Sequence, residues 1–317
     1  MGCNSSTAVF SLIFLMTRPS KKVFSRSLFF LLFVWFDLFF FGCASTSVQN
    51  SKLSESDTQL LLEEELSCLN WQQLAPGINW SKVHNFQIPV IFHIVKINLD
   101  TPGLTLNLYP GSKAFKPSWT DPQNNTVRGI KGITFAEKTN SVVTVNTTPY
   151  ARNSILKRKP SGINFSEGIQ YAPARSRYSA LAFYSDSKNH LRAKIIYSQS
   201  EKLEPETKAV SGAFFTILKN GEIQPFKTDI FDSRTAAAVN EDGSVLWLLV
   251  AEGEHKNKSR GLSYPECAFI FKTLGAWEAL EFDGGSSTSF FINNHSALSY
   301  ASLLHNSSWL GFSINSN

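Results

Sequence analysis

The stretch Ala279-Leu-Glu-Phe-Asp-Gly-Gly-Ser-Ser-Thr-Ser289 sets a short apolar strand directly before a turn of glycine and hydroxyl residues. Asp283 ends the expected strand with a carboxylate, and Gly284 and Gly285 let the backbone turn and approach a ligand closely. The N–H groups of such a turn form a concavity that suits an anion, and further donors follow from the hydroxyls of Ser286, Ser287 and Thr288. A phosphate or phosphodiester fits this pattern. A simple turn in which Asp283 caps its own backbone fits it equally well.

A helix is expected immediately upstream of this strand. It begins with the capping box Ser263-Tyr-Pro-Glu266, in which proline stands in the first turn. Apolar residues then recur at three-residue spacing until Gly275 supplies a C-terminal stop. Glu266 is therefore expected mainly to cap the helix. After Asp283, it is also the second candidate for a catalytic carboxylate.

Elsewhere, short apolar runs alternate with turn residues. Asn220-Gly221 and Glu241-Asp242-Gly243 each separate two such runs and predict hairpins, and Asp100-Thr-Pro-Gly103 is a further turn. Residues 132–138 are expected to be helical. Many strands, few helices and no repeated βαβ unit indicate a single α+β domain over residues 70–317. Strands are expected at residues 90–99, 104–109, 141–146, 180–184, 193–197, 214–219, 222–226, 236–239 and 245–251.

Composition excludes several classes. The chain has 317 residues with 43% apolar content, which is enough for a core and excludes wholesale disorder. Its net charge is +5, but beyond residue 42 only 26 basic side chains stand against 24 acidic ones. This balance gives no reason to expect a nucleic-acid partner. The sequence has no C-x-x-C, H-x-x-x-H, G-x-S-x-G or P-loop motif, so it does not support a Cys/His zinc site, an α/β-hydrolase serine or a nucleotide site.

Residues 1–42 are interpreted as a signal or anchor segment. Basic side chains between Lys21 and Arg26 precede an apolar run of 14 residues at 28–41, whereas a bilayer span takes roughly 20. Gly42-Cys43 is typical of a bacterial lipoprotein signal, so we expect Cys43 to carry lipid at the cell envelope. A cleaved soluble signal or uncleaved anchor, a start at Met16, and myristoylation within Met1-Gly2-Cys3 remain alternatives.

Residues 43–69 are expected to form a polar tether followed by a short helix at 60–69. With Cys43 lipidated, only Cys68 and Cys267 remain in the mature chain, and their spacing gives no evidence for or against a disulfide.

Two further side chains are candidates for substrate contacts. Arg234 stands just before an apolar strand, and its fork of donors suits a phosphodiester, although an arginine there is more often a surface ion-pair partner. Asn146 ends another apolar strand and is either a ligand contact or a turn former.

The order of these segments resembles the phosphodiester glycosidase domain family. That family's pattern runs P-R-T-A, D-G, V-D-G-R, G-x-T-x-x-E-L-A and N-L-D-G-G-G-S-S/T, and residues 231–288 follow it. Val145-Asn146-Thr-Thr-Pro-Tyr150 occupies the place of an upstream I-N-G-x-F-F segment, so that the resemblance covers roughly residues 85–295. Departures from the pattern are Ser233 for proline, Glu254 for the arginine of V-D-G-R, Ser286 for the third glycine, and the missing glycine and phenylalanine pair after Asn146.

The resemblance implies a hydrolase that cleaves the glycosidic bond of a sugar-1-phosphodiester, in glycan or exopolysaccharide processing. It implies that Asp283 and Glu266 are the catalytic carboxylates. It also implies that Arg234 and the turn of residues 284–288 bind the phosphate, and that Asn146 contacts the sugar or the phosphate. No cofactor is required by the pattern, and a divalent cation near Asp283 is an open alternative. The departures keep open a non-catalytic glycan-binding lipoprotein and a transglycosidase that passes the sugar to an acceptor.

Overall fold

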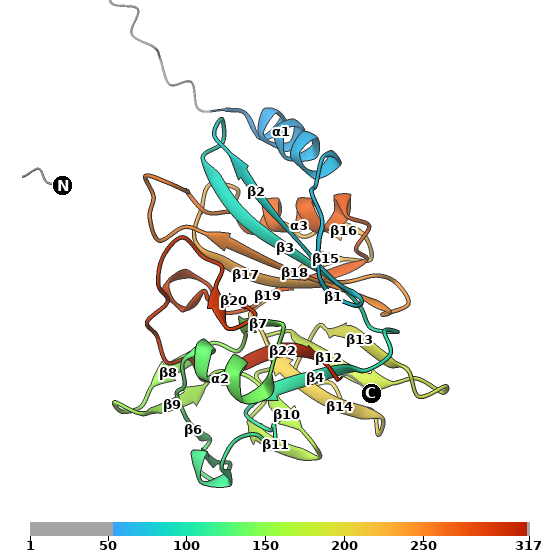
Figure 1. Ribbon diagram of the computed structural model, residues 1–317, viewed down its shortest axis with the longest axis vertical. Coiled ribbons are helices and arrows are strands. Elements are labelled where there is room, and N and C mark those ends of the chain that lie inside the picture. The colour runs from blue at the N-terminus through green and yellow to red at the C-terminus, as the bar shows by residue number, and fades with distance from the viewer. Residues whose placement is uncertain (1–52, 316–317) are drawn as a thin grey trace, which may run out of the picture. The chain divides into compact units, whose positions relative to one another are not determined.

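The computed structural model describes residues 53–315, so Cys43 and the expected signal or anchor in residues 1–42 lie outside the described residues. The central element is an eight-stranded antiparallel sheet (Figure 1). Its strands are, in spatial order, β1 (Gln72–Ala75), β2 (Ile78–Asn85), β3 (Val90–Asn98), β18 (Val245–Glu252), β17 (Arg234–Val239), β19 (Glu278–Glu281), β15 (Thr216–Lys219) and β16 (Glu222–Ile223).

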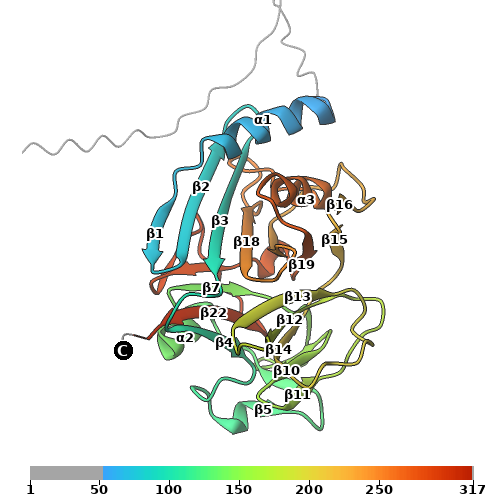
Figure 2. The ribbon, with the colours of Figure 1, turned by 90° about the vertical axis from the view of Figure 1, so that its right-hand side faces the viewer.

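Two helices cover one face of this sheet (Figure 2). The helix α3 (Tyr264–Thr273) starts at the predicted capping box, and α1 (Glu55–Ser67) starts earlier than predicted because Ser54 and Asp57 form a second one. The helices bury apolar side chains against the alternate residues of β17, β18 and β3. Leu62 and Leu66 of α1 belong to this core, so the helix assigned to the tether packs on the domain.

Two five-stranded antiparallel sheets lie against the opposite face. The shared core includes Phe282, which follows β19 of the large sheet, together with Phe312 from one five-stranded sheet and Phe183 from the other. The first sheet has the order β21 (His295–Ser296), β20 (Phe290–Ile292), β7 (Val143–Asn146), β22 (Trp309–Ile314) and β4 (Leu104–Tyr109). The second has the order β11 (Ile169–Ala172), β10 (Asn164–Ser166), β14 (Thr207–Gly212), β12 (Ala180–Ser185) and β13 (Leu191–Ile196).

A small four-stranded sheet and the helix α2 (Gly132–Thr139) complete the described chain. Phe135 of α2 packs on the fully buried Trp309, whose indole N–H donates to the Ile130 carbonyl at 3.2 Å. The small sheet has the order β5 (Thr120–Asp121), β6 (Thr126–Arg128), β9 (Lys157–Pro160) and β8 (Tyr150–Arg152), and the short 3₁₀ turns are η1 (Pro117–Trp119) and η2 (Gly285–Ser287).

The predicted α+β class is confirmed, and so are the hairpins β15–β16 and β17–β18 and the strand pair β12–β13. The strands β3 and β4 do not pair, although Asp100-Thr-Pro-Gly103 joins them. Instead, β3 pairs with β2 and β18, whereas β4 pairs with β22 in another sheet. The turn therefore carries the chain from one layer to the next.

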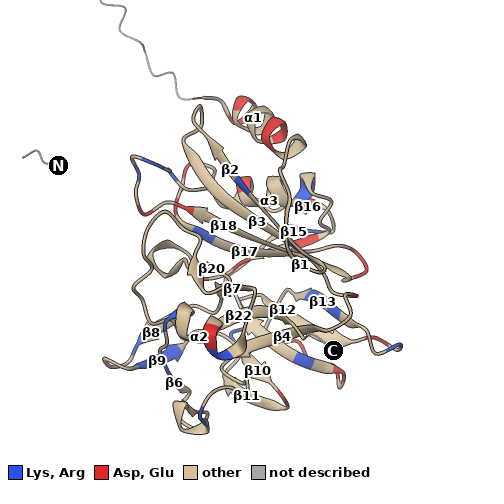
Figure 3. Ribbon diagram, viewed as in Figure 1, with Lys and Arg blue, Asp and Glu red and all other residues tan. Residues whose placement is uncertain are grey.

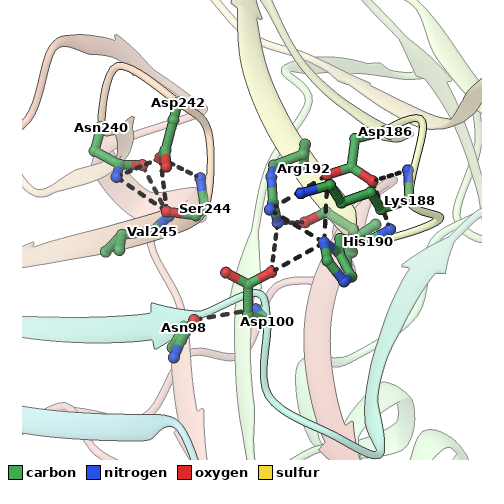
Figure 4. A network of polar contacts seen from close by, with 11 residues as sticks. Asn98, Asp100, Asp186, Lys188, His190, Arg192, Asn240, Asp242, Ser244 and Val245 are labelled. Carbon is green, nitrogen blue, oxygen red and sulfur yellow. Dashed lines mark hydrogen bonds and ion pairs between the residues drawn. The ribbon is translucent and has the colours of Figure 1, made fainter.

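A polar cluster at this turn ties the layers together (Figure 4). Arg192 of β13 forms an ion pair with Asp100 at 2.7 Å and with Asp186 at 3.3 Å. The β17–β18 turn lies beside it, and there Asp242 accepts from Asn240 at 2.7 Å. Because Arg192 is mostly covered while both acids are partly exposed, we expect a stabilisation of about 1 kcal/mol from each contact at most.

Candidate active site

The turn after β19 has a backbone that requires glycine at two positions. A Cβ on Gly284 would stand 2.7 Å from the Ser233 carbonyl oxygen, and Gly285 has a φ of +57°. The Gly285 N–H donates to that same carbonyl at 2.8 Å. The turn is thus packed directly on the residue that precedes β17, whereas the Gly-Gly pair predicted a close approach to a ligand.

Asn146 fixes the turn from the neighbouring sheet. Its side-chain amide donates to the Asp283 carbonyl at 2.7 Å, and its side-chain oxygen accepts from the Thr235 hydroxyl and the Ser289 N–H, both at 2.9 Å. The Asp283 N–H in turn donates to the Thr147 carbonyl at 2.8 Å. Asn146 is almost fully buried, so it positions the turn, and the structure does not support the predicted direct contact with substrate.

The carboxylate of Asp283 is half-buried at the end of this fixed backbone. Burial raises the pKa of Asp283 to about 7, and the Ser287 side chain, which faces it, works in the opposite direction. A carboxyl group with such a pKa changes its charge near neutral pH. This is the range in which a general base is most effective.

The turn offers fewer free amides than predicted. The N–H groups of Gly285, Ser287 and Thr288 donate to carbonyls of Ser233 and of the turn itself, which leaves only those of Gly284 and Ser286 without a backbone acceptor in residues 53–315. The Thr288 side chain is fully buried, so the substrate contact predicted for it is not supported. Ser286 is exposed.

Arg234 is not at the surface, contrary to the surface ion pair considered as its alternative role. It starts β17 and is nearly buried; its Nε donates to the Leu262 carbonyl at 2.8 Å and its Nη2 to the Ile230 carbonyl at 3.0 Å. The guanidinium lies 4.4 Å from the centre of the Tyr264 ring. Its Nη1 has no hydrogen-bond partner among the described residues.

Glu281 lies on the same face of the sheet as Arg234, and sequence reasoning missed it as a site residue. Both of its carboxylate oxygens are buried without a hydrogen-bond partner in the described chain. Burial raises the pKa of Glu281 to about 8, while the Arg234 charge and the neighbouring Cys267 thiol oppose the shift. The available signal was a charged residue between Leu280 and Phe282 in an otherwise apolar strand.

Glu266 is committed to the structure. Its Oε2 accepts from the Ser263 N–H at 2.8 Å to complete the capping box, and Arg260 binds both carboxylate oxygens, at 2.7 and 3.1 Å. A carboxylate held by a cap and a bidentate arginine has little capacity left for proton transfer. The structure therefore supports the capping role and not the predicted catalytic one.

Glu266 borders a cleft of about 260 Å³. Other candidate residues border two separate clefts. A cleft of about 300 Å³ is lined by Arg234 and Tyr264 together with Phe226, Lys227 and Ile230. Burial and the charge of Glu281 raise the pKa of Tyr264, and Asp283 makes a smaller contribution in the same direction. Asp283 itself lines neither of the two clefts. A second cleft of about 410 Å³ is lined by Ser286, Glu254, His255 and the segment 299–304.

A buried pair that the sequence did not reveal supports the second cleft. His93 accepts from the Trp80 indole N–H at Nδ1, so its protonated Nε2 donates to Glu252 at 3.2 Å. Burial lowers the pKa of His93. Burial opposes ionisation of Glu252, but hydrogen bonds from His93 and Ser299 outweigh it and lower its pKa. The ionised Glu252 thus accepts a hydrogen bond from the N–H of Ser299, the first residue of the segment 299–304 that lines the second cleft.

Cys68 is exposed and Cys267 is buried, and they are not bonded to each other. Within residues 53–315, no three His, Cys, Asp or Glu side chains gather as a metal site would need. No helix in that part of the chain is long and apolar enough to cross a membrane.

Comparison with solved structures shows a shared fold. The catalytic domain of zebrafish N-acetylglucosamine-1-phosphodiester alpha-N-acetylglucosaminidase, auto-inhibited by its pro-peptide, matches with a TM-score of 0.53 and 16% identity, over 80% of this chain and 93% of that one. A hypothetical protein from Synechocystis matches with a TM-score of 0.51 and 16% identity over 75% of this chain. The match spans only 62% of the Synechocystis chain.

Of the two sequence comparisons, the one with family profiles identifies a family. Curated proteins gave no match. The profile of the phosphodiester glycosidase family matches residues 131–308, which is more than half of the chain and includes β7, β17, α3 and the Asp283 turn. The resemblance seen in the sequence is confirmed, and the chain belongs to the phosphodiester glycosidase family.

Proposed function

We propose that the protein hydrolyses the glycosidic bond of a sugar-1-phosphodiester, with Asp283 as the general base. The observation that carries this proposal is the half-buried Asp283 carboxylate, which is fixed through its backbone and has a pKa raised to about 7. Membership of the phosphodiester glycosidase family supports the bond that is cleaved.

In this reaction Asp283 takes a proton from water as the water oxygen attacks the anomeric carbon. The bond from that carbon to the phosphate oxygen breaks, and its electron pair stays on the phosphate. The products are a free sugar and a phosphomonoester. Because phosphate leaves as a stabilised anion, strong general-acid assistance is less necessary than for an ordinary glycoside. This agrees with the structural use of Glu266.

The cleft beside Tyr264 is the proposed site of the substrate phosphate. The Nε and Nη2 of Arg234 donate to two backbone carbonyls, which fixes the guanidinium and the position of its third nitrogen, Nη1. Lys227 adds a second positive charge to this cleft. A fixed guanidinium donor and a mobile ammonium group together suit a phosphodiester anion. No step of this scheme requires a metal ion.

The decisive experiment is incubation with a chromogenic sugar-1-phosphodiester, with and without an acceptor alcohol. Release of free sugar supports hydrolysis. An acceptor adduct instead identifies a transglycosidase, and binding without turnover identifies a glycan-binding protein. Glu254, exposed at the second cleft where the family has arginine, is the observation that favours this last alternative.

We also propose that the protein acts at the cell envelope through a lipid on Cys43. The basic and apolar pattern of residues 18–43 supports this placement. Mass spectrometry of the mature protein is expected to find Cys43 at the N-terminus with lipid attached. An intact Met1 or Met16 in a soluble fraction contradicts it.

A further inference from the structure

Basic side chains are frequent in and around the small four-stranded sheet, as at β8 and β9 (Figure 3). Residues 126–160 carry seven basic side chains and one acid, Glu137, although the chain beyond residue 42 is nearly neutral. We call one group of them the basic patch: Arg128, Lys131, Arg152, Lys157 and Arg158. The ion pairs made by lysine and arginine within residues 53–315 involve other side chains, so the patch is not neutralised by carboxylates.

The patch includes a cleft and two aromatic rings. The cleft measures about 760 Å³ and is lined by Trp119, Arg128 and Lys157, with Asp121 as its only acid. The Arg128 guanidinium lies 4.7 Å from the centre of the Trp119 ring, and that of Arg158 lies 5.6 Å from the Tyr150 ring. Stacking holds the exposed Arg128 in place and leaves it available to an anion. Arg158 is almost fully buried and donates to backbone carbonyls of residues 154, 155, 157 and 305, so it adds positive charge beneath the surface but no free donor.

The positive charges act together on one side chain. Burial and the charges of four patch residues lower the pKa of His305, and these residues are Lys131, Arg158, Arg128 and Arg152. The Arg158 Nε also donates to the His305 carbonyl at 2.8 Å. The cations therefore converge on the segment around His305, although they come from β6, the start of α2, β8 and β9.

That segment also contacts the Asp283 turn. The Asn306 side-chain amide donates to the Ser287 carbonyl at 2.8 Å, and the Tyr150 hydroxyl donates to Asn306 at 3.2 Å. Leu304 lines the second cleft together with Ser286. Residues 304–306 thus connect the patch to the Asp283 turn.

We propose that the basic patch binds the rest of a polymeric substrate, an anionic glycan whose sugars are joined by repeated phosphodiester links. The inference rests on the proposed function: a polymer engaged at Asp283 extends along the surface, and each further phosphate meets a cation there. Continuity with the turn favours the substrate itself over a nucleic acid, and the concave shape favours a chain over a flat lipid surface. The net charge gave no reason to expect a nucleic-acid partner, and a whole-chain sum does not reveal this local concentration of basic side chains.

The test compares a charge-reduced patch with a matched control. The patch variant combines Arg128→Gln, Lys131→Gln and Arg152→Gln, all exposed and outside the candidate active site. The control combines Lys202→Gln, Lys208→Gln and Lys272→Gln, which remove the same charge from exposed positions elsewhere. Equilibrium binding of a polysaccharide made of glycosyl-1-phosphate repeats is measured in an Asp283→Asn background, so that hydrolysis does not consume the probe.

We expect the patch variant to bind the polymer about tenfold more weakly, with a shallower dependence of affinity on salt, while the control binds normally. Turnover of a short sugar-1-phosphodiester is expected to be equal in all three proteins with Asp283 intact. Equal weakening in both variants overturns the proposal. So does binding of single-stranded DNA or anionic vesicles that is as tight as binding of the polymer.

The two proposals fail separately. If no phosphodiester is hydrolysed but the patch variant alone loses the polymer, the proposed function is wrong and the patch stands. If the short substrate is hydrolysed and the patch variant binds the polymer normally, the function stands and the patch assignment is wrong.

Discussion

The Asn146 side-chain amide donates to the Asp283 carbonyl at 2.7 Å, across 137 positions of sequence and between two different sheets. This contact, with the acceptor bonds from Thr235 and Ser289, makes one buried amide the fixed point of the turn. The catalytic candidate is therefore positioned through its backbone, while its carboxylate stays free for chemistry.

Removing this amide is expected to unfold the protein more easily. Asn146→Ala leaves a buried carbonyl, a hydroxyl and an amide N–H without partners, and we expect a loss of about 2–4 kcal/mol in the free energy of unfolding. Urea denaturation measures it. Asn124→Ala, at an exposed turn, is the control and is expected to change stability little. A stable Asn146→Ala protein with an unaltered turn contradicts the positioning role.

Asp283→Asn is expected to reduce turnover at least about a hundredfold, or roughly 2.7 kcal/mol in barrier. The amide keeps the size of the side chain and removes its charge, so binding of the sugar phosphate survives or tightens. Because a partly desolvated charge is lost, the melting temperature at pH 8 is not expected to fall. Near-normal turnover in a stable variant would falsify the catalytic assignment and favour a simple turn.

The wild-type pH profile tests the same group independently. A general base works only when deprotonated, so kcat/KM is expected to rise as the pH increases through about 7. Steady-state rates between pH 5 and pH 9 measure the profile. A rate that is flat over this range, or one that falls as Asp283 ionises, contradicts the base role.

Arg234→Lys is expected to lower kcat/KM about tenfold or more, because the ammonium group cannot hold the two carbonyls and still present a fixed donor to phosphate. We also expect the melting temperature to fall, since the side chain is nearly buried and not a surface ion-pair partner. Lys227→Gln is the comparison: it removes a charge from the same cleft and is expected to raise KM without lowering the melting temperature. Full activity of Arg234→Lys contradicts a phosphate contact.

Local signals predicted the hairpins, α3 and the glycine turn, because their geometry is set within a few residues. Pairings such as β7 with β22 join residues far apart in sequence, so no local pattern predicts them. The strands of the small sheet are short and polar, and they lack the alternation of apolar residues that predicts a strand. The role of Arg234 depended on which layer covers its face of the sheet. The alternation along β17 assigns Arg234 and Thr235 to opposite faces, but only the fold shows that α3 covers one and Asn146 the other.

The last prediction concerns Glu281, whose carboxylate is buried with only the weakly donating Cys267 thiol beside it. Its pKa in the folded protein is about 8, raised from 4.5, so the folded state holds this proton more tightly than the unfolded chain does. The resulting stabilisation is fully present below pH 4.5 and is lost as the pH rises through 8.

The glutamine of a Glu281→Gln variant does not titrate. We therefore expect the variant to gain stability relative to wild type by a few kcal/mol between pH 5 and pH 9, at about 1.4 kcal/mol per pKa unit. Urea denaturation of both proteins at each pH measures the difference between their free energies of unfolding. Asp283 is present in both proteins, so its own pH-dependent contribution cancels in this difference. Glu222→Gln, at an exposed strand, is the control and should show no such trend. A constant difference between wild type and Glu281→Gln would mean that Glu281 is paired when ionised, with Arg234 close enough to offset its burial.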